Sequence, residues 1–157
     1  MLFRSSWLIG AATTGIRFSA ATPPGHAPNK GAVSLAKSIA RGTGASLTLL
    51  EDPKEAVEGA DCIITDTFVS MGFDKERKER ARAFLPKYRV DRRLMALAKR
   101  GAIFQHCLPA HRGEEVTDEV IDGPNSAVWD EAENRLHTTK ALLCYLMLRR
   151  TELRKLS

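Results

Sequence analysis

The chain has 157 residues, of which 43% are hydrophobic and 27% are charged, and its formal net charge is +5. These values are typical of a single soluble globular domain, and the basic balance suits anionic small molecules or nucleic acid without choosing between them. No apolar run approaches the roughly 20 residues that a membrane span needs. The three cysteines are far apart and form no CxxC pair, which argues against a disulfide framework and a structural zinc site.

We therefore expect one domain over residues 1–157, in a reducing compartment such as the cytoplasm. No acidic residue precedes Glu51, so a mitochondrial transit peptide or a short secretory signal in the first twenty residues is the alternative. Residues 1–5 are a candidate non-native start, and residues 151–157 are expected to form a tail.

Periodicity and capping residues predict helices that alternate with strands. Helices are predicted at residues 6–14, 30–41, 52–58, 74–84, 91–99 and 133–150, with a short one capped by Thr117. Apolar or alternating runs predict strands at 16–20, 46–50, 62–65, 102–105 and 127–129. This alternation predicts an α/β fold, a three-layer, Rossmann-like arrangement in which a parallel sheet carries helices on both faces.

The densest chemistry follows the strand at 102–105, in the stretch HCLPAHRGEEV at residues 106–116. In open α/β sheets such strand ends face the ligand crevice. A lone histidine or cysteine here would be a satisfied core histidine or a buried thiol in an ordinary turn. Two histidines, a cysteine and an arginine around one proline favour a binding or catalytic site. We expect His106 and His111 themselves to be structural rather than catalytic.

Three motifs resemble those of the ornithine carbamoyltransferases, in the same order: DTFVSMG at 66–72, HCLPAHRGEEVTDEV at 106–120 and VWDEAENRLH at 128–137. They correspond to the second half of that enzyme, which implies an ornithine-binding domain without its carbamoyl-phosphate domain. The family's domain opens with a strand that should precede the helix at 6–14 and is absent here. We therefore expect a slot in the sheet and two exposed strand edges.

The resemblance implies transfer of a carbamoyl group from carbamoyl phosphate to the δ-amine of L-ornithine, giving citrulline and phosphate in arginine metabolism. It implies no cofactor and no metal. The cysteine that follows His106 favours ornithine over aspartate carbamoyltransferases. The match at Ser70-Met71-Gly72 favours ornithine over its acetylated or succinylated forms.

Asp66 would pair with the α-ammonium of ornithine, the role of its counterpart in the family. On spacing alone, an aspartate that caps the next turn is an equal alternative. Ser70 and Met71 match the loop residues that close over ornithine. Taken alone, these two residues would form an ordinary tight turn.

Cys107 matches the cysteine that lies between the two substrates, and we do not expect a covalent nucleophile because transfer is direct in this family. The Leu108 carbonyl is expected to orient the δ-amine, with its direction fixed by a cis bond to Pro109. Arg135 matches the arginine that reaches carbamoyl phosphate, where a planar guanidinium suits carbonyl and phosphate oxygens. Its alternative is a salt bridge at the start of the helix, with Glu131 or Glu133.

The family's phosphate-binding motifs have no counterpart in this sequence, and no glycine-rich nucleotide loop replaces them. We expect little activity from the chain alone, a need for a separate carbamoyl-phosphate domain, and doubtful trimerisation. A non-catalytic ornithine-binding or interaction module is the alternative. A nucleic-acid surface on the basic stretch 75–93 is disfavoured because acidic residues interleave it without an aromatic platform, namely Glu76, Glu79 and Asp91.

Overall fold

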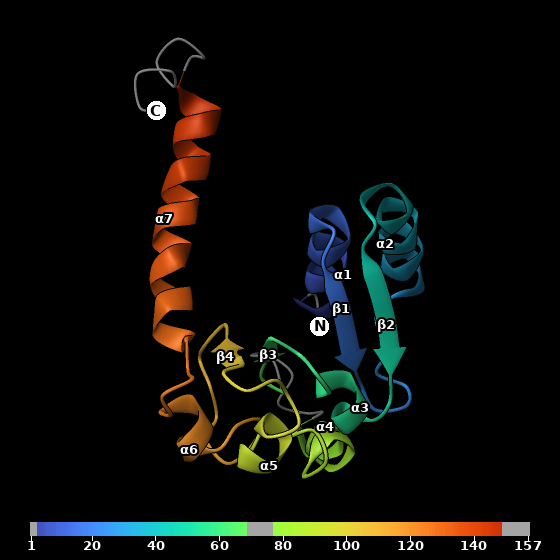
Figure 1. Cartoon of the computed structure of the whole chain (residues 1–157), viewed down its shortest axis with the longest axis vertical. Coiled ribbons are helices and arrows are strands. Elements are labelled where there is room, and N and C mark those ends of the chain that lie inside the picture. Colours follow the sequence, from blue (N-terminus) through green and yellow to red (C-terminus); the bar gives the residue numbers. More distant parts are fainter. Residues whose placement is uncertain (1–2, 69–76, 149–157) are drawn as a thin grey trace.

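The computed structural model describes residues 3–68 and 77–148, and these form short parallel strands with helices around them (Figure 1). The strands are β1 (Arg17–Ala21), β2 (Ser46–Leu50), β3 (Cys62–Thr65) and β4 (Ile103–His106). The helices are α1 (Phe3–Thr14), α2 (Lys30–Thr43), α3 (Pro53–Val57), α4 (Arg77–Phe84), α5 (Arg92–Met95), α6 (Asp118–Ile121) and α7 (Val128–Met147). The predicted α/β class and parallel pairing are confirmed.

The described strands form two two-stranded parallel sheets instead of one continuous sheet. β1 pairs with β2, and β3 pairs with β4 with Cys62 opposite Ile103. On its other side, β4 makes a single bridge between Phe104 and Ser126. Within residues 3–68 and 77–148, β1, β2 and β3 each keep one edge without a strand partner. The sequence predicted two exposed strand edges, so the described chain has one more than expected.

The first sheet packs against α1 and α2 through small side chains. Leu8 and Ala12 of α1 meet Ala36 of α2 in a buried cluster that also touches the strands. The Asn29 side chain accepts backbone hydrogen bonds at the start of α2, and Gly44 ends the helix in the left-handed conformation with φ 77°. Alanines on both helices allow the backbones to approach closely, which explains the compact packing at this end of the chain.

The second sheet lies in the larger apolar core. Phe104 at the centre of β4 is fully buried, whereas its neighbour Ile103 is 39% exposed. This difference follows from the alternation of side chains across a strand. The core around Phe104 contains buried residues of β3 and of the segments before, between and after the two strands, namely Val57, Ile63, Val90, Leu94, Val116, Val120, Ile121 and Val128.

An aromatic cluster joins the two sheets. The rings of Phe68 and Phe84 stack with their centroids 4.8 Å apart, and Tyr88 meets Phe84 edge-on at 5.5 Å. The Tyr88 hydroxyl donates to the carbonyl of Glu51 over 2.6 Å. Because Phe68 follows β3 and Glu51 follows β2, the cluster connects the ends of strands from different sheets. Burial raises the pKa of Tyr88, and the charges of Glu51 and Asp52 raise it further.

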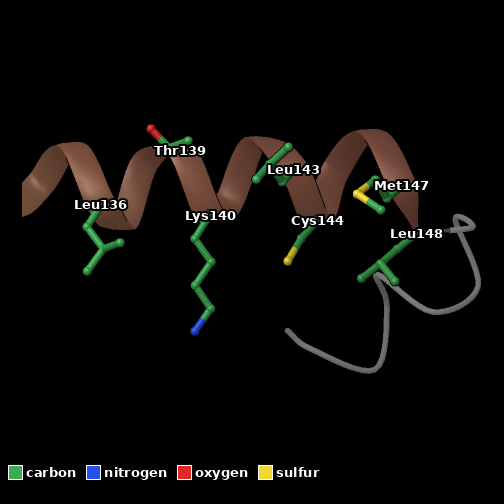
Figure 2. Close-up of a pocket in the computed structure, with 7 residues that line it drawn as sticks. All are labelled: Leu136, Thr139, Lys140, Leu143, Cys144, Met147 and Leu148. Carbon is green, nitrogen blue, oxygen red and sulfur yellow. The ribbon is translucent and has the colours of Figure 1, made fainter.

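Helix α7 extends away from the rest of the described chain as a long separate helix, coloured orange to red in Figure 1. Its first residue, Val128, is fully buried, but Leu136 is 68% and Met147 77% exposed. Figure 2 shows an open apolar hollow whose lining comes from this helix and its end: Leu136, Thr139, Lys140, Leu143, Cys144, Met147 and Leu148. No described element covers this face. No helix in the described ranges is long and apolar enough to cross a membrane.

Three local predictions are wrong. The helix predicted at 91–99 is limited to α5, Arg92–Met95. The strand predicted at 127–129 does not form: pairing with β4 stops at one bridge, where the Ala127 N–H donates to the Phe104 carbonyl, because Val128 already begins α7. The apolar run there reflects a helix start buried in the core. Thr117 precedes α6 as predicted, but its side chain makes no capping hydrogen bond. Asp52 caps α3 at the start of the helix predicted at 52–58, since its side chain accepts from the Lys54 N–H at 3.0 Å.

Candidate functional site

The parallel pairing of β3 and β4 brings two polar side chains together at the strand ends. Thr65 and His106 are opposite each other at the last register position, so Asp66 and Cys107 leave the sheet side by side. The Cys107 thiol donates to Asp66 Oδ1 over 3.2 Å, and the same oxygen accepts from the Thr67 N–H at 2.8 Å. Asp66 Oδ1 therefore contacts both Cys107 and the backbone of the next residue.

The environment of Cys107 keeps its thiol protonated. Burial, the hydrogen bond to Asp66 and the charges of Asp66 and Glu131 together raise the pKa of Cys107 to about 12. The thiolate is the nucleophilic form of cysteine, so at neutral pH this side chain is a hydrogen-bond donor. Burial and the charge of Glu131 also raise the pKa of Cys62, on the neighbouring strand, to about 11.

Leu108 has an unusual backbone conformation for a residue with a side chain. Its φ is 52°, in the left-handed region, and the following bond to Pro109 is cis as expected from the sequence. Non-glycine residues rarely adopt a positive φ, because Cβ then crowds the backbone. The neighbouring residues must therefore hold Leu108 in place, and such positions cluster at functional sites.

Arg135 reaches the same loop from α7. Its Nη1 donates to the carbonyl oxygen of Cys107 over 3.3 Å. Glu131, one turn earlier on α7, interacts with this guanidinium electrostatically, but the hydrogen bond itself goes to the loop. The exposed guanidinium thus places a positive charge beside the Asp66–Cys107 pair.

Glu131 is a further acidic group of the site, which the sequence indicated only as a salt-bridge partner of Arg135. Burial raises the pKa of Glu131, while the backbone N–H of His106 and the charge of Arg135 lower it, with a net upward shift. Its Oε2 is buried and, within the described residues, accepts no hydrogen bond. Its position in the first turn of α7 also suits the helix dipole.

The carboxylate of Glu115 is a second buried acidic group that contacts this loop. Glu115 and His106 are both fully buried, and Glu115 Oε1 lies 3.3 Å from His106 Nε2. The same oxygen accepts a short hydrogen bond from the His111 N–H. Burial raises the pKa of Glu115, but the His106 ring and the backbone N–H of His111 outweigh it and lower the pKa below its usual value.

One group in the described ranges has donor atoms close enough together to hold a metal ion: His111, Glu114 and Glu115, within 4.8 Å of one another. Glu115, its only buried member, is already engaged by His106 and by the backbone of His111. These contacts involve Oε1, whereas Oε2 is buried, makes no hydrogen bond within the described residues and lies 3.8 Å from His111 Nδ1. We assign no metal to the group.

The structure brings four of the predicted site residues together: Asp66, Cys107, Leu108 and Arg135. Ser70 and Met71 lie outside the described residues. The sequence did not indicate Glu115 or Glu131 as part of the site. The only available signal was the acidic character of the two motifs, which does not tell a buried glutamate from an exposed one.

A parallel α/β domain with polar side chains gathered at adjacent strand ends is a small-molecule-binding domain. The family model described as aspartate/ornithine carbamoyltransferase, Asp/Orn binding domain, matches residues 3–146. The chain belongs to this family.

Similar proteins are ornithine carbamoyltransferases of about twice this length. That of Bifidobacterium longum subsp. infantis is 54% identical over 142 residues, which is 90% of this chain and 44% of the relative. The solved structure of the Pyrococcus furiosus enzyme is 48% identical with a TM-score of 0.84, covering 89% of this chain and 44% of that one. An acetylornithine transcarbamylase complexed with acetylcitrulline is 31% identical, with a TM-score of 0.81, over 93% of this chain and 44% of that one.

Proposed function

We propose that this chain is the ornithine-binding part of an ornithine carbamoyltransferase. The reaction transfers the carbamoyl group of carbamoyl phosphate to the δ-amine of L-ornithine, giving citrulline and phosphate. The observation that carries the proposal is the contact between Cys107 and Asp66 at the carboxyl ends of two paired strands, inside two of the family's motifs. The cytoplasm is the expected compartment, with the mitochondrion as the alternative.

The proposed binding mode assigns one end of ornithine to Asp66. Within the described residues its Oδ2 accepts no hydrogen bond, because Oδ1 takes both the Cys107 thiol and the Thr67 N–H. An α-ammonium is a suitable donor for Oδ2, and a charge-assisted hydrogen bond is stronger than a neutral one. Ser70 and Met71 are proposed to close over the ligand, as the resemblance implies.

The proposed chemistry takes place at the loop that follows β4. The δ-amine must be neutral to attack, since only then does its nitrogen have a free electron pair. The Leu108 carbonyl would accept a hydrogen bond from the amine and so point the lone pair of the δ-nitrogen at the carbamoyl carbon. The new C–N bond forms as the C–O bond to phosphate breaks, and the proton that the amine loses passes to an oxygen of the departing phosphate. Cys107, a protonated thiol, is a donor in this step and not the base.

Arg135 is proposed to bind carbamoyl phosphate. Its guanidinium donates a hydrogen bond to the Cys107 carbonyl. It would turn to the carbamoyl or phosphate oxygens when that substrate binds. This change replaces one neutral acceptor by a charged one, which favours the substrate-bound arrangement.

Ornithine is proposed over acetylornithine. The identity to ornithine carbamoyltransferases is 54% and 48%, against 31% to the acetylornithine enzyme. A free α-ammonium also matches the available Oδ2 of Asp66, whereas an acetylated amine carries no charge to offer it.

A carbamoyl-phosphate domain is the proposed partner. The chain spans 44% of the length of the relatives compared, and Arg135 is the one phosphate-binding candidate that the motifs supply. We expect the isolated chain to bind ornithine and to turn over slowly or not at all. A trimer is not proposed for this chain alone.

The test measures ornithine binding by calorimetry and citrulline formation with both substrates, with Arg135→Ala as the control. Ornithine binding without turnover, followed by turnover when a separately expressed carbamoyl-phosphate domain is added, is the expected result. Binding that yields no citrulline even with that domain would favour the alternative, a non-catalytic ornithine-binding module. A chain that does not bind ornithine under any of these conditions contradicts both readings.

A further inference from the structure

Glu115 is held in the core by its backbone as well as by its side chain. Its carbonyl accepts from the Val90 N–H over 2.9 Å, and Val90 in turn accepts from the Thr117 N–H over 3.1 Å. These bonds anchor the residue to the segment before α5, which is distant in the sequence. The backbone of Glu115 therefore has little conformational freedom, and this holds its carboxylate close to the loop.

The carboxylate contacts both ends of the loop that carries the proposed ornithine site. Glu115 Oε1 lies 3.3 Å from Nε2 of His106, the last residue of β4, and it accepts from the N–H of His111. Cys107 and Leu108 lie between these two residues. One buried carboxylate thus fixes the entry and the exit of the loop.

The other nitrogen of the His106 ring shows which tautomer is present. Nδ1 accepts a hydrogen bond from the Leu108 N–H at 2.8 Å, so Nδ1 must be without a proton. A neutral imidazole then has its proton on Nε2, which lies 3.3 Å from Glu115 Oε1. Within the described residues Nε2 makes no aligned hydrogen bond, so the attraction between the two groups is electrostatic. A carboxylate at this position stabilises that tautomer. Carboxylates orient metal-bound and catalytic histidines in the same way, by attracting the ring N–H.

The hydrogen bond from Leu108 to His106 acts at the backbone position with a φ of 52°. A leucine in the left-handed region reverts to an ordinary conformation unless its neighbours restrain it. The Leu108 N–H, directed to His106 Nδ1, supplies such a restraint. The direction of the Leu108 carbonyl therefore depends on the state of the His106 ring.

We propose that Glu115 is a positioning residue, which selects the Nε2–H tautomer of His106 and through it fixes the Leu108 backbone that meets the δ-amine of ornithine. This inference rests on the proposed function, and it adds a residue that touches no substrate. His106 relays the effect, which agrees with the expectation that it is structural rather than catalytic.

The first experiment determines the tautomer in the full, ligand-free chain by ¹⁵N NMR of the histidine rings. His106 is expected to show a protonated Nε2 and an unprotonated, hydrogen-bonded Nδ1 at neutral pH. A proton on Nδ1 would overturn the proposal. Because no ornithine is present, the result does not depend on whether the chain binds it, whereas an ornithine titration of the same sample tests the proposed function.

The second experiment compares Glu115→Met with Glu115→Gln. Methionine has a similar length but no acceptor, so the His106 tautomer preference and the protection of the Leu108 amide from exchange are expected to be lost. Glutamine keeps an oxygen that can accept, and it is expected to restore both. Unchanged His106 and Leu108 signals in a folded Glu115→Met chain would overturn the proposal.

A third comparison does not require a change in Glu115. His106→Asn places an oxygen close to the original Nδ1, whereas His106→Gln places its amide close to Nε2 and leaves the Leu108 N–H without an acceptor. We expect ornithine affinity to fall at least about tenfold more in His106→Gln, the equivalent of one buried hydrogen bond. Equal losses in two folded variants would count against the relay. The exposed His137→Asn serves as the control.

Discussion

The Cys107 thiol donates to the Asp66 carboxylate over 3.2 Å, and this bond links the ends of β3 and β4. The two residues are 41 positions apart in the chain, and the parallel register of the strands brings them together. Asp66 is therefore oriented from two sides, by a thiol and by the Thr67 N–H. A carboxylate that is oriented before the ligand arrives loses less entropy on binding.

The substitution Asp66→Asn should remove most of the affinity for ornithine. The amide cannot supply the charge that a bound α-ammonium needs, and loss of one charge-assisted hydrogen bond costs about 1.5–3 kcal/mol, or roughly 10- to 150-fold in affinity. Isothermal titration calorimetry measures the change. The control is Asp61→Asn, which removes an exposed partner of Lys99 at the opposite end of β3 from Asp66. Equal affinities of the Asp66→Asn chain and the unmodified chain would refute the assignment.

Cys107 should react with iodoacetamide much more slowly than Cys144 at pH 7–8. A pKa of about 12 leaves almost no thiolate at Cys107, and Cys144 is on the open helix α7. Asp66→Asn removes a hydrogen-bond acceptor and a charge that both raise the pKa, so it should accelerate alkylation of Cys107. Mass spectrometry of digested chains gives the rate at each cysteine. Faster reaction at Cys107 than at Cys144 in the unmodified chain would contradict the burial and pairing described above.

The stability of the chain should fall at acid pH in part through Glu115. The folded pKa of this carboxyl is lowered, so its contribution is present above its unfolded value of about 4.5 and is lost as the pH falls through the folded pKa. Urea unfolding between pH 7 and pH 3 measures the effect. In Glu115→Gln, which has no titrating group there, the decline below pH 4.5 should be shallower. Parallel pH profiles for the two chains would show that other carboxyls govern the acid transition.

Phe104→Ala should cost about 3–5 kcal/mol of stability, because the side chain is fully buried at the centre of the larger core. The adjacent Ile103→Ala, at a position that is 39% exposed, should cost much less. Chemical denaturation of both variants tests the alternation along β4. Similar losses of stability at the two positions would mean that Phe104 and Ile103 do not differ in burial in solution.

Leu143→Glu should leave the unfolding temperature nearly unchanged, since its side chain is 51% exposed on α7 and lies in the hollow of Figure 2. Exposed substitutions away from special features usually change stability by less than about 0.5 kcal/mol. Thermal unfolding by circular dichroism provides the measurement. Leu8→Glu, in the buried cluster between α1 and α2, is the destabilising reference. A large loss in the α7 variant would show that another surface covers this helix.

The sequence predicted the elements that depend on short, local signals. The bounds of β2 and β3 match the predicted runs, and α2 and α3 begin within one residue of the predicted helices. Such features depend on a few consecutive residues, so the chain encodes them locally. The sequence also placed Asp66 and Cys107 directly after predicted strands, but the hydrogen bond between them was not predicted.

Burial could not be predicted from the sequence where distant segments determine it. The two consecutive glutamates after Gly113 look equivalent, and Glu115 is the buried one because Val90 pairs with this segment from 25 residues earlier. Val128 likewise suggested a strand because it is apolar and β-branched, although tertiary packing places it at the start of a helix.

The aromatic joint between the two sheets has a consequence for cooperativity. No backbone ladder runs from β1 to β3 in the described chain, so the two halves share the rings of Phe68, Phe84 and Tyr88 and the hydrogen bond to Glu51. Side-chain contacts of this kind transmit less stabilisation than a continuous sheet would. We therefore expect the helix pair α1 and α2 with its sheet to open while the Phe104 core stays folded, so that the two halves exchange and unfold as separate units.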